Sequence, residues 1–132
     1  MALSSDDRQS FAYARVAGLK AALHLTPDQE KNWPAVEAAL FAAAGARAAR
    51  GKEVKQLRSK ASLDLAERLR DRAKGLRSRA EHVEKFAAAA APLLKSLNEA
   101  QTRRFGLVLR GYARQRQAAR TWRRVAGRFA AA

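Results

Sequence analysis

Two short motifs of the same type, 72 residues apart, constrain the fold of this chain more than any other feature. The first is Leu25-Thr26-Pro27-Asp28-Gln29 and the second is Leu97-Asn98-Glu99-Ala100-Gln101. In each, a Thr or Asn that suits the N-cap of a helix is followed three residues later by a Gln, which reaches back to the backbone N–H of the cap. Each motif therefore predicts a sharp, structurally capped corner, and together they predict two helix–corner–helix units joined through the middle of the chain.

The composition of the 132 residues favours helix and excludes several classes of site. Alanine, leucine and arginine are abundant and β-branched residues are scarce, which predicts an all-α fold. The chain has no cysteine, so disulfides, thiolate catalysis and Cys-ligated metals are excluded. The length fits a single domain, residues 1–132. The longest apolar run, residues 86–94, is about half the length of a membrane span, so we expect none.

Helical periodicity and start signals predict four helices, over residues 6–24, 27–59, 62–96 and 99–129. The two middle helices are long, and we expect kinks where Pro34 and Pro92 each remove a backbone hydrogen bond. Two arrangements remain open, a simple up-and-down bundle and a bent, open hairpin. Because so much of the apolar content is alanine, a lone chain buries little apolar area, which favours oligomerisation.

Apolar stripes mark the faces that we expect to be buried. The first helix carries its stripe up to Leu23. The second begins a stripe at Trp33 that weakens after Ala44, because Arg47 and Gly51 occupy the next positions. The third helix has the clearest pattern, a heptad-like seam that alternates three- and four-residue steps: Ala66, Leu69, Ala73, Leu76, Ala80, Val83, Ala87, Ala90, Leu94 and Leu97.

The net charge of +15 arises from 27 Lys and Arg residues against 12 Asp and Glu residues. On the third predicted helix, Arg68, Arg72 and Arg79 lie along one flank of the seam, and only Arg68 has an acidic residue at ideal helical spacing. A basic flank beside small apolar residues is typical of a shallow, non-specific binding surface, because charge attracts a ligand that apolar patches then hold weakly. The alternative is a solvated face that only keeps the chain soluble.

The last predicted helix is the most basic segment. No acidic residue follows Glu99, whereas nine arginines do. A helical projection places five of them opposite an apolar stripe that includes Phe105 and Trp122: Arg103, Arg110, Arg114, Arg124 and Arg128. A helix of this kind binds nucleic-acid phosphates, anionic lipid or an acidic protein. No base-reading motif accompanies it, so any binding to nucleic acid would be independent of base sequence.

Catalysis and metal binding find no support in the sequence. His24 lies next to a predicted helix end, and His82 stands between Glu81 and Glu84, which lie on other faces of the helix. No nucleophile–base pair and no phosphate-binding loop is visible. We therefore expect a protein that is not an enzyme and has no cofactor and no metal site within one chain. A zinc site completed across a dimer stays open.

The two corners also carry a family resemblance. With Asn32-Trp33-Pro34 behind the first motif and Arg103-Arg104-Phe105 behind the second, residues 8–110 resemble the Spy/CpxP family of bacterial periplasmic proteins, whose signature is a doubled LTxxQ motif. The second copy has Asn98 in place of Thr, and Asn caps a helix at least as well. The Arg-rich segment after Arg110 departs from the family pattern.

The resemblance implies a helical chain that forms a curved antiparallel homodimer with a basic, patchily apolar concave face. One family branch consists of ATP-independent chaperones, another regulates an envelope-stress sensor kinase, and a third binds zinc. We accordingly expect a periplasmic chaperone or stress accessory protein whose unfolded or partly folded clients contact Arg68, Arg72, Arg79, Leu57, Leu65 and Phe41. One alternative is that the last helix binds a polyanion. The other is that the protein modulates a sensor kinase, which would then be its acidic protein partner. Residues 1–7 lack the pattern of an export signal, so the predicted location follows from the resemblance alone.

Overall fold

The computed structural model describes the backbone of residues 3–59 and 64–130, and the side chains of residues 3–58, 64–111, 114, 118 and 121. The described chain is all-α, as predicted, and contains no strand within those residues. Its helices are α1 (Ser5–Leu23), α2 (Pro27–Glu30), α3 (Trp33–Ser59), α4 (Leu65–Ser96) and α5 (Glu99–Ala130). The first and last predicted helices are thus confirmed to within one residue at each end.

The second predicted helix is divided in two. A turn at Lys31 and Asn32, in which the Asn32 N–H donates to the Gln29 carbonyl at 3.0 Å, separates α2 from α3. Pro34 is the second residue of α3, so the helix breaks before this proline instead of kinking at it. Proline suits the first turn of a helix because its missing N–H has no partner to lose there.

The third predicted helix corresponds to α4 with a later start. The side chain of Asp64 is its N-cap and accepts from the Glu67 N–H at 2.7 Å, whereas Ser62, the predicted start, lies outside the described residues. Pro92 lies inside α4, and the helix continues past it to Ser96. Within the described helices, none is long and apolar enough to cross a membrane.

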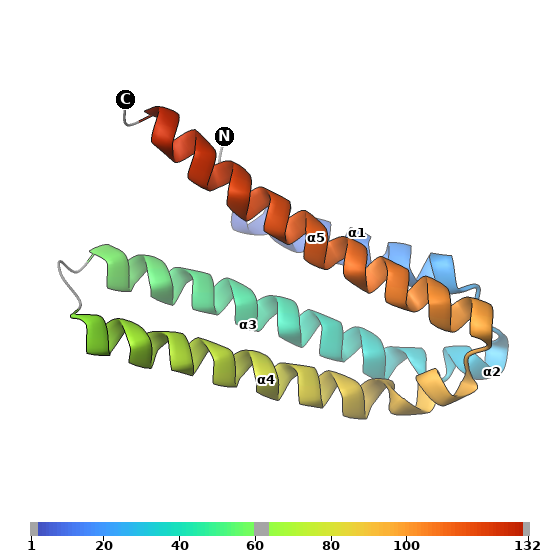
Figure 1. The fold of residues 1–132 in the computed structure, drawn as a ribbon. Helices are drawn as coiled ribbons and strands as arrows, with labels where there is room; N and C mark the ends of the chain where they lie inside the picture. The colour runs from blue at the N-terminus through green and yellow to red at the C-terminus, as the bar shows by residue number, and fades with distance from the viewer. Residues whose placement is uncertain (1–2, 60–63, 131–132) are drawn as a thin grey trace.

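The helices form two antiparallel pairs. Helix α3 packs along α4, while α1 packs on α5 and on the beginning of α3. Figure 1 shows that the two pairs lie closest together at the end that holds α2 and diverge toward the opposite end. This arrangement corresponds to the open hairpin that the sequence analysis left as one of two alternatives.

The core lies entirely at the end where the pairs converge. Its buried apolar residues come from two stretches, residues 16–36 and 90–105: Val16, Leu19, Leu23, Trp33, Val36, Ala90, Leu93 and Phe105. The stripes predicted for the first helix, the start of the second and the start of the last are therefore confirmed. Leu40 of α3 and Val108 of α5 are half-buried and pack against this core.

The seam predicted for α4 is wrong over its outer half. Leu69, Leu76 and Val83 are exposed to solvent, and α4 turns Asp71 and Gly75 toward α3 instead. The apolar stripe of α3 weakens after residue 44, and beyond it Val54 and Leu57 are the only described half-buried apolar residues of that helix larger than alanine, so that little apolar surface is available there to cover the seam.

At the inner end, Ala90 of the seam is buried and Leu97 is half-buried against the core. The predicted Leu94 is exposed, whereas Leu93, which is not part of the seam, is buried in its place.

Candidate functional site

The two predicted corners form as capping boxes. At the first, the Gln29 N–H donates to Oγ1 of Thr26 at 3.3 Å, and the Thr26 N–H donates to Oε1 of Gln29 at 3.0 Å. At the second, the Gln101 N–H donates to Oδ1 of Asn98 at 2.8 Å, and the Asn98 N–H donates to Oε1 of Gln101 at 3.0 Å. Asn98 therefore performs the same capping function as Thr26, as the sequence predicts. The leucines that open the motifs, Leu25 and Leu97, are half-buried against the core.

The motif glutamines also meet each other in the core. Both are buried, and their amides form a reciprocal pair, with Nε2 of Gln29 donating to Oε1 of Gln101 at 3.0 Å and the reverse bond at 2.8 Å. Among the described residues no buried side-chain nitrogen or oxygen lacks a hydrogen bond. Because unpaired polar groups are costly in a core, this pair fixes one relative position of the two corners.

Each glutamine in addition satisfies the end of a helix from the other unit. The remaining N–H of Gln29 donates to the Ser96 carbonyl at 2.7 Å, at the end of α4. That of Gln101 donates to the Leu23 carbonyl at 3.1 Å, at the end of α1. Free carbonyls at helix ends need such partners. The sequence analysis missed this cross-capping, although two motifs of the same type, each with a Gln at the same position, were a signal for it.

A row of exposed apolar side chains follows one face of α4. We call it the α4 stripe, and its members are 72%, 58%, 57% and 60% exposed, in the order Leu65, Leu69, Leu76 and Val83. The predicted binding arginines lie beside it and are all exposed. Arg72 and Arg79 are each three or four residues from two stripe members, and Arg68 is three residues from Leu65. No ion pair among the described residues involves any of the three, so their charge faces solvent.

Two other predicted client contacts lie elsewhere. Phe41 is half-buried, packs against the core and contacts the ring of Tyr13 with a centroid distance of 4.7 Å, so it offers a client little exposed surface. Leu57, on the outer half of α3, is also half-buried. Of the three predicted apolar contacts, only Leu65 is exposed, because the faces of α3 that carry the other two turn toward α1 and α4.

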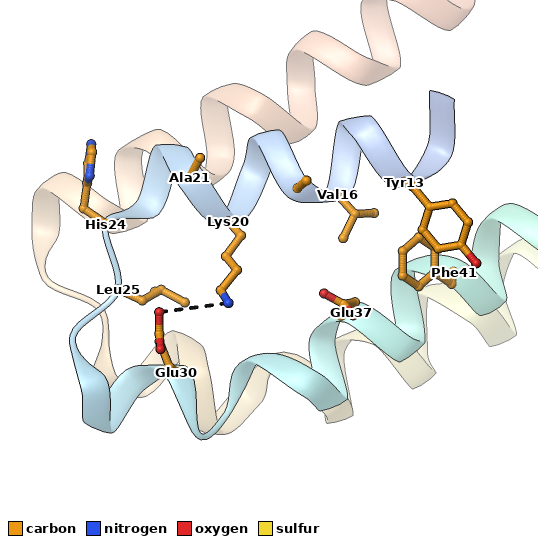
Figure 2. A pocket seen from close by; sticks show the side chains of 10 residues that line it. Tyr13, Val16, Lys20, Ala21, His24, Leu25, Glu30, Glu37 and Phe41 are labelled. Carbon is orange, nitrogen blue, oxygen red and sulfur yellow. Dashed lines mark ion pairs between the residues drawn. The ribbon is translucent and has the colours of Figure 1, made fainter. Parts of the chain in front are cut away.

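A groove of about 580 Å³ lies between α1 and α3 near the first corner. Figure 2 shows Lys20 and Glu37 pointing into the space between these helices, with Tyr13 and Phe41 at one end. Lys20 Nζ lies 4.0 Å from a carboxylate oxygen of Glu30, and Glu37 accepts a hydrogen bond from Trp33 Nε1 at 2.8 Å. Lys20 and Glu30 of the groove therefore form an ion pair, and the Glu37 carboxylate has a hydrogen-bond donor within the chain.

A cluster of four charged residues connects the outer halves of α3 and α4. Arg50 Nη2 donates to Oδ1 of Asp71 at 2.8 Å and Nη1 donates to Oε2 of Glu53 at 3.1 Å, while Lys74 pairs with the other carboxylate oxygen of Glu53. The hydrogen bond from Lys74, followed by that from Arg50, lowers the pKa of Glu53 below its ordinary value. The bond to Asp71 raises the pKa of Arg50. We call these four residues the Arg50 cluster.

The arginines predicted to bind polyanions are described only in part. Arg103, Arg110 and Arg114 are exposed, and none of them takes part in an ion pair among the described residues. The side chains of Arg124 and Arg128 lie outside the described set. The described part of α5 thus presents an unneutralised basic surface.

The two histidines lie apart from any cluster of metal ligands. No group of three His, Asp or Glu side chains with suitable geometry occurs among the described residues. A ring nitrogen of His82, Nδ1, lies 2.7 Å from the Ser78 carbonyl. Elsewhere on α4, Glu81 forms an ion pair with Lys85 at 3.1 Å, whereas Asp64 caps the helix and forms no ion pair with Arg68.

Comparison with known proteins identifies the family. The family model of LTXXQ motif family proteins matches residues 12–106, a stretch that contains both corners and all of α2, α3 and α4. No curated protein and no solved structure matches the chain. The match covers well over half of the chain and ends early in α5. The chain therefore belongs to the LTXXQ motif family, the family of Spy/CpxP-type proteins.

Proposed function

We propose that this protein is a periplasmic, nucleotide-independent chaperone that binds partly unfolded proteins on the outer face of α4, and that it is not an enzyme. The observation that carries the proposal is the α4 stripe, because four large apolar side chains, from Leu65 to Val83, are exposed beside three arginines that form no ion pair with any described residue. Soluble proteins seldom expose a continuous apolar row unless it binds something. Membership of the LTXXQ family supports the periplasmic location and the class of partner.

The arrangement of the stripe suits weak and reversible binding. An unfolded client exposes apolar side chains and acidic groups in many orders, so a receptor for it needs small contacts of both kinds and no fixed pocket. The arginines attract acidic stretches over a distance that salt limits to about 10 Å at 0.1 M. Each exposed Leu or Val then contributes to the free energy of binding in proportion to the apolar area that the client covers, roughly 25 cal/mol per Å².

An aggregation assay with a heat-stressed or reduced client at low salt tests the proposal. We expect the wild-type protein to suppress light scattering at stoichiometric amounts. The double variant Leu69→Ser/Leu76→Ser is expected to lose most of this effect. Leu107→Ser is the matched control, because Leu107 is equally exposed, at 55%, but lies on α5. Absence of suppression by the wild-type protein would remove the proposal.

The oligomeric state decides how the stripe is used. The family resemblance predicts an antiparallel homodimer, and a second copy that covered the stripe would leave no client surface there. Sedimentation of the wild-type protein and of Leu69→Ser/Leu76→Ser, at the concentration of the assay, shows whether the stripe is a dimer contact or a client surface. If the double variant dissociated a dimer and still suppressed aggregation, the stripe would be the dimer contact and the proposed client surface would be wrong.

The arginines beside the stripe have a separate test. The triple variant Arg68→Gln/Arg72→Gln/Arg79→Gln keeps hydrogen-bonding side chains but removes three charges. We expect it to slow the association of an acidic client and to weaken the dependence of that rate on salt, since rim charges mainly affect association rates. An unchanged salt dependence would show that these arginines only keep the chain soluble.

A second candidate function is sequence-independent binding of a polyanion by α5. It is favoured by Arg103, Arg110 and Arg114, which are exposed and form no ion pair among the described side chains, and by the position of most of the basic segment beyond the family match, which ends at residue 106. Affinity for DNA of arbitrary sequence would then fall steeply with salt. Arg110→Gln/Arg114→Gln in the full chain is expected to reduce both the affinity and the salt dependence. No binding at about 50 mM salt would exclude this function.

A further inference from the structure

The outer half of the α3–α4 hairpin is held together without an apolar core. None of the described residues from 37 to 89 is buried. Around the middle of the hairpin the half-buried positions are small or charged, apart from Val54: Ala46, Arg50, Glu53 and Val54 on α3, and Asp71, Ala73, Gly75 and Ser78 on α4. Arg50 lies about 20 Å beyond Val36, the last buried residue of α3. The contact between the helices at this distance from the core depends on what Arg50 binds.

The guanidinium of Arg50 lies directly against Gly75, and we call this position the seat of Arg50. A Cβ at position 75 would lie 3.2 Å from Nε of Arg50, which is tighter than most Cβ contacts, so a larger side chain there would push the guanidinium from its present position. From this seat Nη2 donates to the backbone carbonyl of Asp71 at 2.6 Å as well as to its carboxylate at 2.8 Å. Lys74 of α4 completes the connection by pairing with Glu53 of α3.

The Arg50 cluster is accessible to salt. The side chains of Arg50 and Asp71 are 22% and 25% exposed, and that of Glu53 is 39% exposed. Charged pairs of this kind weaken as ionic strength rises, whereas an apolar core does not. The outer half of the hairpin and the corner end therefore respond differently to the same change in solution.

Leu57 lies beyond the cluster on the same face of α3. It follows Arg50 by seven residues, or two helical turns, and it is half-buried although most neighbouring positions are exposed. If α3 and α4 separate at the cluster, Leu57 and the inner surface around Ala46 and Ser78 become accessible. This surface would add to the apolar area that the α4 stripe already presents on the outside.

We propose that the Arg50 cluster is a latch: closed, it holds the outer halves of α3 and α4 together, and open, it adds the inner surface around Leu57 to the client-binding face. The latch itself is independent of any client. Its use in binding rests on the proposed chaperone function.

Thiol labelling measures the opening directly, because the natural chain has no cysteine. Ser78→Cys reports the inner surface and Leu76→Cys reports the outer one, which is already exposed. We expect Arg50→Ala to raise the labelling rate of the inner cysteine by about tenfold, which corresponds to ~1.4 kcal/mol in the opening equilibrium. The outer cysteine is expected to change by less than about twofold. In the protein with native Arg50, raising NaCl from about 0.1 M to about 1 M is expected to act in the same direction.

Three further variants keep the test decisive. Arg47→Ala removes the same charge from the same helix but makes no ion pair in the described structure, so labelling of the inner cysteine should stay at the native rate. Arg50→Lys keeps the charge but loses the forked geometry, and an intermediate rate is expected. Gly75→Leu fills the seat of Arg50 with a good helix former and leaves every charge in place; it should raise the rate as Arg50→Ala does, and it serves if Arg50→Ala loses helicity.

The client assay completes the experiment. If the latch regulates binding, Arg50→Ala suppresses aggregation at a lower molar ratio than Arg47→Ala does. Unchanged labelling of the inner cysteine in Arg50→Ala, Gly75→Leu and about 1 M NaCl would overturn the latch. Faster labelling with unchanged suppression would confirm the opening and contradict its role in binding. Failure of the wild-type protein to suppress aggregation would contradict the proposed function and leave the labelling result intact.

Discussion

The two ends of this molecule are held together by different physical means. At the corner end, eight apolar residues and two glutamines are buried, and every buried side-chain polar group that is described has a hydrogen bond. On the outer half of the α3–α4 hairpin, no described residue is buried, and the helices are connected by the Arg50 cluster. Most of the stability therefore resides at one end, and the surfaces available for binding lie at the other.

This difference explains why the most apolar face of α4 lies in solvent. The corner end fixes the rotation of α4 through Ala90 and Leu93, which point into the core. Because a helix keeps its register over its whole length, the outer residues must follow that rotation. Asp71 and Gly75 then face α3, and Leu69 and Leu76 do not. The packing at the corner end thus determines which side chains of α4 are exposed on the outer half of the hairpin.

The largest expected effect is a contrast between two leucines of α4. Leu93→Ala, at the fully buried position, is expected to cost about 2–5 kcal/mol of unfolding free energy because it leaves a cavity. Leu76→Ala, the same change on the exposed stripe, is expected to stay within about 0.5 kcal/mol. Urea unfolding followed by circular dichroism at several protein concentrations measures both. Similar costs, independent of concentration, would contradict the contrast between the two ends.

The second effect concerns the glutamine pair. Gln101→Ala is expected to cost about 1–3 kcal/mol, because the Asn98 N–H, the Leu23 carbonyl and the Gln29 amide all lose a partner in the core. Since both glutamines form one network, Gln29→Ala/Gln101→Ala should cost less than the sum of the single variants. Gln9→Ala on the exposed face of α1 is the control and should be close to neutral. Additive costs would show that the two amides act independently.

The corners could be predicted from the sequence because each is a local pattern. Thr26 and Gln29 are three residues apart, and so are Asn98 and Gln101, so capping follows from spacing alone. The pairing of Gln29 with Gln101 is a contact over 72 residues, which no local rule contains. The sequence indicates that the chain has two corners, but only the packing of the helices brings them together.

The α4 stripe was only half predictable, for a related reason. Periodicity correctly places Leu69, Leu76 and Val83 on one face, but it does not say which neighbour covers that face. The weakening of the α3 stripe after Ala44 already indicated that α3 would offer little apolar surface to cover this face of α4. The expectation for Pro34 failed because a proline near the start of a pattern is compatible both with a kink and with a new helix.

A smaller difference in stability is expected between variants of two helix N-caps, Asn98 at the corner end and Asp64 on the outer half of the hairpin. Asn98→Ala is expected to cost about 1 kcal/mol, because it leaves the Gln101 N–H without its acceptor next to the buried glutamine pair. Asp64→Ala removes the equivalent acceptor from the exposed start of α4. Its effect should be confined to the first turns of that helix, which amide hydrogen exchange of residues 65–70 detects. A larger loss of global stability for Asp64→Ala than for Asn98→Ala would mean that the outer half contributes more than its burial indicates.

The smallest expected effect is a local response to acid. The hydrogen bonds from Lys74 and Arg50 lower the pKa of Glu53 below 4.5, so its carboxylate stabilises the closed hairpin fully above that value. As the pH falls through the lowered pKa, Glu53 takes up a proton and this contribution is lost. The groups that face Glu53 are Arg50 and Lys74, and Asp71 competes with it for the same guanidinium. Amide chemical shifts of residues 50–57 should therefore move below about pH 4.5 while those of the buried corner stay constant.

The Glu53→Gln variant tests the origin of that response. Its outer hairpin should resemble the acid form already at neutral pH and respond less to further acidification, because the titrating group has been removed. Glu84→Gln is the matched control, since Glu84 is exposed on α4 and belongs to no ion pair among the described residues. If Glu53→Gln and Glu84→Gln titrated alike, acid would be acting on the hairpin through its general charge and not through the Arg50 cluster. The Arg50 cluster would then contribute nothing measurable to the contact between α3 and α4, and the distinction between a packed end and a latched end would be lost.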